Sequence, residues 1–232
     1  MKLRHHRFFF SALLLVLCLS LSSCTAAGFV PKSDTSWGEL FRHFDSAEFS
    51  ELDPQLQQMM DETILSQEVA ENQAQPLAET DSVGMIYPEE DSDGAQEILD
   101  KAIYASADGL LSDQTETEPG LIVFDLVSYP QADESGIEYA GHLSTFADCP
   151  GACVLVALQD SASGELVAFD CTDDLSHHTS ASGTISQTIM KDNFDDLKPG
   201  HEYTIKARAF VLPPEGRSID GSLYTEASLA TL

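Results

Sequence analysis

The clearest structural signal in the chain is the stretch Leu197-Lys198-Pro199-Gly200-His201-Glu202-Tyr203, which leads directly into an alternating segment. Pro-Gly predicts a tight turn, because proline presets φ and glycine adopts conformations closed to other residues. After the turn, one set of residues alternates with another: Tyr203, Ile205, Ala207, Ala209 and Val211 against Thr204, Lys206, Arg208 and Phe210. This period of two predicts a strand. A buried tyrosine there needs a hydrogen-bond partner for its hydroxyl.

Similar short segments, separated by turn residues, fill the C-terminal half of the chain. Six more strands are predicted around residues 122–126, 137–143, 153–158, 166–169, 185–189 and 223–232. The third and fourth of these flank Asp160-Ser161-Ala162-Ser163-Gly164, which predicts a hairpin. About seven strands at this spacing predict an all-β, two-sheet antiparallel sandwich over residues 119–232.

This half of the chain resembles a fibronectin type III or related immunoglobulin-like module. The resemblance rests on the Leu, Pro-Gly and Tyr of residues 197–203. It implies a tyrosine corner, in which the ring of Tyr203 packs in the core and its hydroxyl bonds a backbone group upstream. Two features depart from the family pattern: the tryptophan of an early strand is missing, and residues 145–152 have no counterpart. Such a module implies a spacer or binding surface and no particular chemistry.

The first 23 residues have the organisation of an export signal. Lys2, Arg4 and Arg7 precede an apolar run over residues 8–21, which is too short to cross a bilayer as a helix. The run ends in Leu21-Ser22-Ser23-Cys24, which resembles the lipobox of bacterial lipoproteins. The resemblance implies cleavage before Cys24 and a covalent diacylglycerol with palmitate-type chains on its thiol. An uncleaved membrane helix or an ordinary signal peptide are the alternatives.

Residues 24–118 are strongly acidic and are expected to form a stalk or linker with short helices. Ser36 and Glu39 form a capping box before a helix that carries Trp37, and Asp53-Pro54 begins a second helix. A third helix is predicted over residues 98–105, ending near Asp108-Gly109. Residues 72–93 have the composition of a flexible linker. The helices either dock on the sandwich or await a partner.

The charge of the chain excludes some partners. It has 39 acidic against 11 basic residues, and three of the basic ones lie in the leader. A nucleic-acid-binding protein needs a basic patch, and anionic lipid repels an acidic surface. We therefore expect no nucleic acid, and contact with the membrane only through the lipid on Cys24.

Three cysteines remain in the mature chain besides Cys24. Cys149, Cys153 and Cys171 allow one disulfide and leave one thiol. Cys149 could pair with Cys153 across the turn between them, or Cys153 could pair with Cys171 across the predicted hairpin. A structural bridge or buried thiols are favoured over a redox role, because the spacing is CxxxC and no βαβ pattern surrounds it.

A calcium loop is a further hypothesis for the acidic region. The relevant residues are Glu89, Asp91, Asp93, Gly94, Glu97 and Asp100, at positions 1, 3, 5, 6, 9 and 12 of a calcium-binding loop. The competing interpretation is an acidic first turn of a helix, where carboxylates complement the helix dipole. His177 and His178 are interpreted as solvated loop residues. The sequence contains no motif of a known catalytic site, so we expect a protein that is not an enzyme.

Together these features predict a lipoprotein on the extracytoplasmic face of the cell membrane. It would present a β-sandwich binding or adhesion module on an acidic stalk, to an envelope protein or a glycan. The alternative is a calcium-stabilised or thiol-dependent accessory subunit of an exported enzyme or envelope complex.

Overall fold

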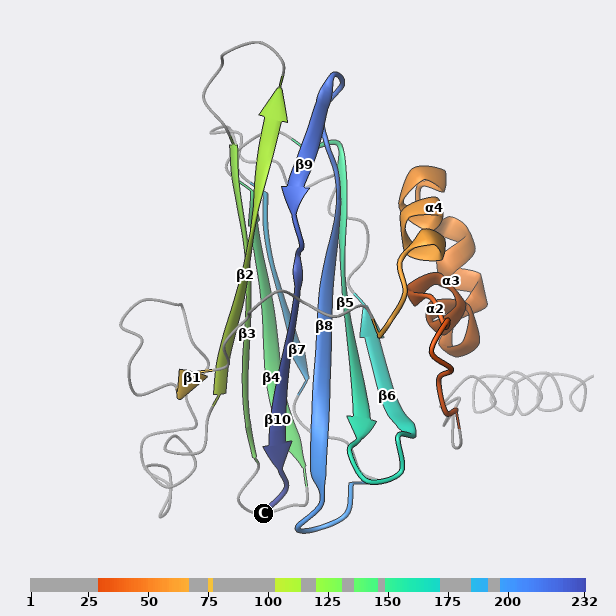
Figure 1. Ribbon diagram of the computed structural model, residues 1–232, viewed down its shortest axis with the longest axis vertical. Helices are drawn as coiled ribbons and strands as arrows, with labels where there is room; N and C mark the ends of the chain where they lie inside the picture. The colour runs from red at the N-terminus through yellow and green to blue at the C-terminus, as the bar shows by residue number, and fades with distance from the viewer. Residues whose placement is uncertain are drawn as a thin grey trace, which may run out of the picture.

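The computed structural model describes most of the β-rich half of the chain and the helices that precede it. The described residues are 29–66, 75–76, 103–113, 120–130, 136–145, 149–171, 185–191 and 197–232. Within these ranges the protein consists of two antiparallel sheets and three short helices (Figure 1). None of the described helices is both long enough and apolar enough to cross a membrane.

The larger sheet has the strand order β1-β2-β3-β4-β7, and β9 also pairs with β2. Its strands are β1 (Gln75–Pro76), β2 (Ile103–Asp113), β3 (Gly120–Pro130), β4 (Ile137–Thr145), β7 (Ile185–Lys191) and β9 (Arg217–Gly221). The smaller sheet has the order β10-β8-β5-β6. Its strands are β5 (Gly151–Asp160), β6 (Leu166–Cys171), β8 (Glu202–Leu212) and β10 (Tyr224–Ala230). The predicted antiparallel arrangement in two sheets is confirmed.

The main core lies between the two sheets and is formed by alternate residues of their strands. Along β4 buried and half-buried residues alternate strictly, as a strand with one covered face requires. Ile122, Phe124 and Leu143 of one sheet are buried with Val154, Ile205 and Ala207 of the other. The predicted hairpin is also present, since β5 pairs with β6 across the turn at Asp160–Gly164.

Strand β5 is buried on both faces, and this explains its continuous apolar sequence. Ala152, Val154 and Val156 point into the core between the sheets, whereas Cys153 and Leu155 belong to a second cluster on the outer face. A strand covered on both sides has no need for alternating polarity. The cover on the outer face is the helical layer that Figure 1 shows beside β5 and β6.

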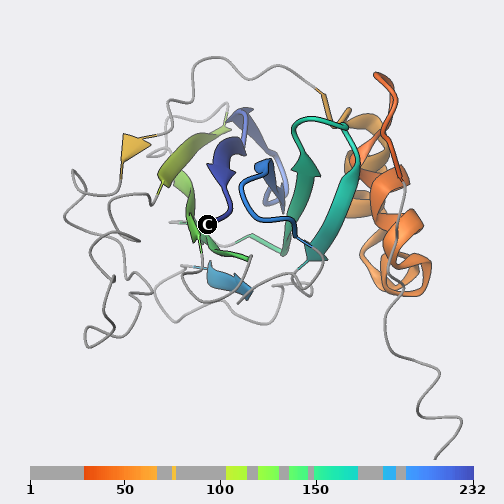
Figure 2. The ribbon, with the colours of Figure 1, turned by 90° about the horizontal axis from the view of Figure 1, so that it is seen from below.

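The helical layer consists of α2 (Trp37–Phe44), α3 (Ser46–Glu51) and α4 (Pro54–Glu62). The two predicted helix starts are confirmed: the Ser36 side chain accepts from the Glu39 N–H at 3.0 Å, and Asp53 caps α4 with Pro54 as its first residue. Of the two alternatives for these helices, docking on the sandwich is the one observed. Seen from below, the layer lies outside the sheet that contains β5 and β6 (Figure 2).

The third predicted helix, over residues 98–105, is wrong where the structure describes it. Ile103 begins β2, and this strand continues through Asp108-Gly109, where the helix was expected to end. Gly109 pairs with Ile122 of β3 on one side and with Gly221 of β9 on the other. Pairing with β3, the next strand along the chain, and with the distant β9 has overridden the local helical spacing.

Strand β2 of the larger sheet therefore comes from residues 24–118, the acidic region that was expected to form a stalk. The predicted linker, residues 72–93, lies outside the described residues apart from the two residues of β1. The loop over residues 145–152, which has no place in the family pattern, ends in the described residues Cys149–Gly151 at the start of β5.

Candidate functional site

The outer face of the smaller sheet and the helices that cover it bring together most of the aromatic side chains of the N-terminal segment. We call this region the helix-covered face; its buried residues are Trp37, Leu40, Phe41, Phe49, Leu52, Leu56, Met60, Leu65, Cys153, Leu155, Ala157, Leu166, Phe210, Leu212 and Tyr224. Trp37 is 0% exposed, and its ring meets those of Phe210 and Tyr224 edge-on at centroid distances of 6.5 and 6.4 Å. The tryptophan thus links α2 to β8 and β10.

Hydrogen bonds and an ion pair tie α2, and the residue before its cap, to the C-terminal end of α4 and the residues that follow it. The Trp37 N–H donates to the Thr63 carbonyl at 2.9 Å, and the Leu65 N–H donates to the Thr35 carbonyl at 2.8 Å. The Arg42 guanidinium contacts the Asp61 carboxylate at 2.6 Å. A Cβ at position 38 would collide with the Asp61 carboxylate, so a larger residue than Gly38 would have to displace the side chain that Arg42 contacts.

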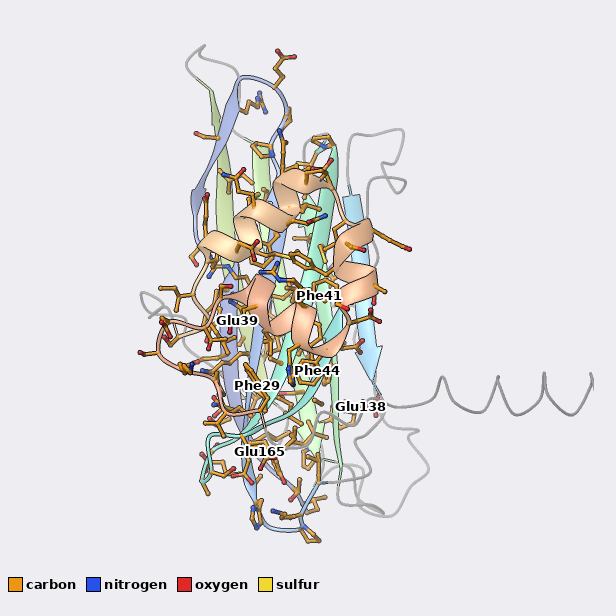
Figure 3. All side chains as sticks on the ribbon, turned by 90° about the vertical axis from the view of Figure 1, so that its right-hand side faces the viewer. Phe29, Glu39, Phe41, Phe44, Glu138 and Glu165 are labelled. Carbon is orange, nitrogen blue, oxygen red and sulfur yellow. The ribbon has the colours of Figure 1, made fainter. Side chains whose placement is uncertain are left out.

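The segment before α2 is attached to the edge of the smaller sheet. The Leu166 N–H donates to the Phe29 carbonyl at 2.8 Å, which adds an isolated bridge to β6. The Phe29 ring lies 4.4 Å from that of His43, and the Phe44 ring stacks on that of Phe169 at 5.2 Å. Figure 3 shows Phe29 and Phe44 on this side of the molecule, near Glu165.

The three cysteines lie on opposite sides of the smaller sheet: Cys149 just before β5, Cys153 on β5 and Cys171 on β6. Cys149 is buried in the core between the sheets, whereas Cys153 and Cys171 belong to the helix-covered face. Cys171 pairs in register with Leu155, two residues beyond Cys153. Of the two pairings left open by the sequence, only Cys153 with Cys171 has both thiols on one face. The structure itself holds the three residues as thiols.

The Cys171 thiol connects β6 to α3. Its S–H donates to a carboxylate oxygen of Glu48 at 3.2 Å. Burial raises the pKa of Cys171 far above its usual value, and the nearby Glu48 carboxylate raises it further. Because the thiolate is the nucleophile and metal ligand, this environment makes Cys171 a structural hydrogen-bond donor instead of a reactive group.

The structure also contains three contacts between tyrosine and carboxylate that the sequence analysis did not foresee. The Tyr104 hydroxyl donates to Asp125 at 2.5 Å, that of Tyr139 to Asp170 at 3.2 Å, and that of Tyr224 to Glu226 at 2.9 Å. Burial raises the pKa of Tyr139 and of Tyr224, and the neighbouring carboxylates act in the same direction. Only the pair on β10 is close in sequence, so the other two had no local signal.

The Tyr203 hydroxyl has a hydrogen bond to an upstream backbone group, as the sequence resemblance implied. The Lys198 N–H donates to the Tyr203 hydroxyl at 3.1 Å, and Gly200 in the turn has φ of 72°. Beside it, Asp160 accepts from the N–H groups of Ala162 and Ser163 and lies 3.3 Å from His201. The hydrogen bond from the Ser163 N–H is the largest of the effects that lower the pKa of Asp160.

The remaining predicted site residues are not placed. The lipidation residue Cys24, the calcium set (Glu89, Asp91, Asp93 and Asp100) and the His177-His178 pair lie outside the described residues. Within the part of the chain that the structure describes, no group of three or more His, Cys, Asp or Glu residues could hold a metal ion. No protein-family model and no curated protein sequence matches this chain.

Proposed function

We propose that this protein is a lipoprotein, held at the extracytoplasmic face of the cell membrane by a lipid on Cys24, and that its β-sandwich is a binding or adhesion module. The observation that carries the proposal is the leader that ends in Leu21-Ser22-Ser23-Cys24. The small residues before the cysteine suit a signal peptidase that cuts there, and the preceding apolar core has the length of a signal sequence. Two or more acyl chains provide a stable anchor, where one chain alone is marginal.

We further propose that the sandwich is of the fibronectin type III or immunoglobulin-like kind. The order β3-β4-β7 in one sheet and β10-β8-β5-β6 in the other supports this. In chain order these strands correspond to A, B and E of one sheet and to C, C′, F and G of the other. Tyr203, at the start of the strand that corresponds to F, occupies the position of the tyrosine corner. Strands β1, β2 and β9 are additions to that pattern.

A binding role fits the polar groups of the described residues better than catalysis does. Burial, and then the hydrogen bond to Glu48, raise the pKa of the Cys171 thiol, and the hydroxyls of Tyr139 and Tyr224 each donate to a carboxylate. These groups therefore hydrogen-bond to each other within the fold, as buried polar groups do. The proposed partner is a protein or glycan of the cell envelope, and the acidic charge argues against nucleic acid.

Metabolic labelling with palmitate tests the anchor. The full chain is produced in a bacterium that processes lipoproteins, as wild type, as Cys24→Ser and as Cys18→Ser. Wild type and C18S should incorporate the label and C24S should not, because only the cysteine after the small residues is modified. The C18S protein is the matched control, since Cys18 lies within the same leader. An unlabelled wild-type protein, or a labelled C24S protein, would contradict the proposal.

Binding to envelope fractions tests the role of the sandwich. Soluble residues 25–232 are incubated with envelope vesicles that are untreated, digested with protease or digested with glycosidase. Saturable binding that one of the two treatments abolishes is expected, and the treatment identifies the class of partner. Heat-denatured protein is the control for adhesion of unfolded chain. Absence of saturable binding to untreated vesicles would refute the binding role.

A further inference from the structure

The connection between the proposed lipid anchor and the folded part of the protein is very short. Only the four residues Thr25 to Gly28 separate Cys24 from Phe29, and Phe29 is the first described residue. From this geometry we propose that the bilayer lies beside β6 and α2, so that the sandwich is held close to the membrane surface. This inference rests on the proposed lipid at Cys24.

Phe29 is the residue at which the tether ends, because its backbone is attached to the sandwich. Its carbonyl accepts from the Leu166 N–H at 2.8 Å, so its backbone is joined to β6. The following residues are also held: the Lys32 N–H donates to the Thr35 hydroxyl at 2.9 Å, and the Thr35 N–H returns to the Lys32 carbonyl at 3.2 Å. Ser36 then caps α2. From Phe29 onward the chain therefore follows the surface of the sandwich.

Covalent geometry limits the distance between the anchor and β6. Five residue steps lead from Cys24 to Phe29, and a fully extended chain spans at most about 3.6 Å per step, which gives about 18 Å. The 11 residues of β8 extend over roughly 36 Å at about 3.3 Å per residue. The tether is thus shorter than the sandwich is long, whatever conformation residues 25–28 adopt.

The tether also distinguishes the two ends of the sandwich. Leu166 follows the turn at Asp160–Gly164, and Asp160 pairs with Tyr203 at the start of β8. Leu212, at the other end of β8, pairs with Gly151 and leads into the turn before β9. The turn between β8 and β9 is at the opposite end from the Asp160 turn, so it lies at the end of the sandwich that is farther from the anchor.

The acidic surface of the protein would not by itself stay near an anionic bilayer, so the lipid anchor is needed to hold it there. The protein has 39 acidic and 11 basic residues, and Figure 3 shows Glu165 and Glu39 on the side that carries Phe29. An acidic surface is repelled by anionic lipid. The lipid on Cys24, and not attraction of the surface, would therefore hold this side near the bilayer.

Energy transfer from Trp37 to the membrane tests the inference, since it is the only tryptophan in the chain and lies in α2. Lipidated full-length protein is reconstituted into phosphatidylcholine vesicles that contain a dansyl-labelled headgroup. The comparison is a variant with 40 Gly and Ser residues inserted between Ala26 and Ala27, whose flexible span averages roughly 35 Å. Transfer should be strong in the wild type and fall at least about threefold in the insertion variant, because transfer decreases steeply with distance. The insertion precedes every described residue, and an unchanged Trp37 emission maximum shows that folding is retained.

Flotation of the vesicles separates the possible failures. Protein that floats with the vesicles but gives equally weak transfer in both forms would overturn the proposed position and leave the lipid anchor intact. Protein that does not float, and carries no acyl chain by mass, would overturn both the anchor and the position. Strong transfer in the wild type that the insertion reduces supports the inference.

Discussion

Replacement of Phe41 by alanine tests whether the helices and the sandwich unfold as one unit. Phe41 is 0% exposed, and its ring lies 5.5 Å from that of Phe49 in α3 and 5.2 Å from that of Phe169 in β6. Removal of a buried phenylalanine side chain costs about 3–5 kcal/mol through lost burial and the cavity that remains. At about 2–4 °C per kcal/mol for a protein of this size, the melting temperature should fall by roughly 6–20 °C.

The assay is urea unfolding of residues 25–232, followed in parallel by Trp37 fluorescence and by far-ultraviolet circular dichroism. Trp37 reports on the helix-covered face, whereas the dichroism signal is dominated by the strands. In a single cooperative unit both signals change together, and F41A lowers both midpoints without changing the slope. Phe44→Ala is the matched control: Phe44 is half-buried and stacks on the same Phe169, so its loss should cost only about 1–2 kcal/mol.

Two results would refute the reasoning. An F41A protein with the wild-type midpoint would show that the ring is not buried against β6. A fluorescence transition at lower urea than the dichroism transition, already in the wild type, would show that the helices form a separate layer with its own stability. In that second case the attachment of Phe29 to β6 would not limit the distance between the anchor and the sandwich.

Three further predictions concern single groups. Tyr203→Phe should cost about 1–2 kcal/mol in urea unfolding, because the partly buried Lys198 N–H loses its acceptor; a cost below about 0.5 kcal/mol would contradict this. Glu48→Gln should lower the pKa of Cys171 and speed its alkylation by iodoacetamide at pH 8, as mapped by peptide mass, whereas an unchanged or slower rate would contradict the assigned contact. The free energy of unfolding should be constant at neutral pH and decline above about pH 9, because Cys171 and Tyr224 have raised pKa values in the folded state and the unfolded chain loses these protons first. Urea midpoints that are flat from pH 8 to 11 would refute the pH dependence.

The strands that the sequence predicted correctly have signals of short range. Alternation is visible within β4 and β8, and the Asp160–Gly164 turn identifies the hairpin of β5 and β6. The helix starts at Ser36 and Asp53 were equally local, since each depends on residues within one turn. Local chemistry therefore sufficed for most elements of the fold.

The elements that the sequence analysis missed depend on pairing at long range. The helical spacing that suggested a helix included Ile103 and Ala105 at the start of β2, and pairing with neighbouring strands, β9 among them, makes this segment a strand. Gly109 meets Gly221 of β9, a segment with few apolar residues and no alternation to reveal it. The contact between Glu48 and Cys171 spans 123 residues, so no motif could have indicated it. Contacts between residues far apart in the chain determine these features, and a pattern read from a short stretch of sequence carries no information about such contacts.

Intact-mass analysis of the protein extracted from bacterial membranes tests the central claim most directly. The account predicts a mature chain that begins at Cys24 and carries the added mass of a diacylglycerol, with or without a further acyl chain on its amino group. A chain that retains residues 1–23, or one that is cleaved there and carries no acyl chain, would contradict it.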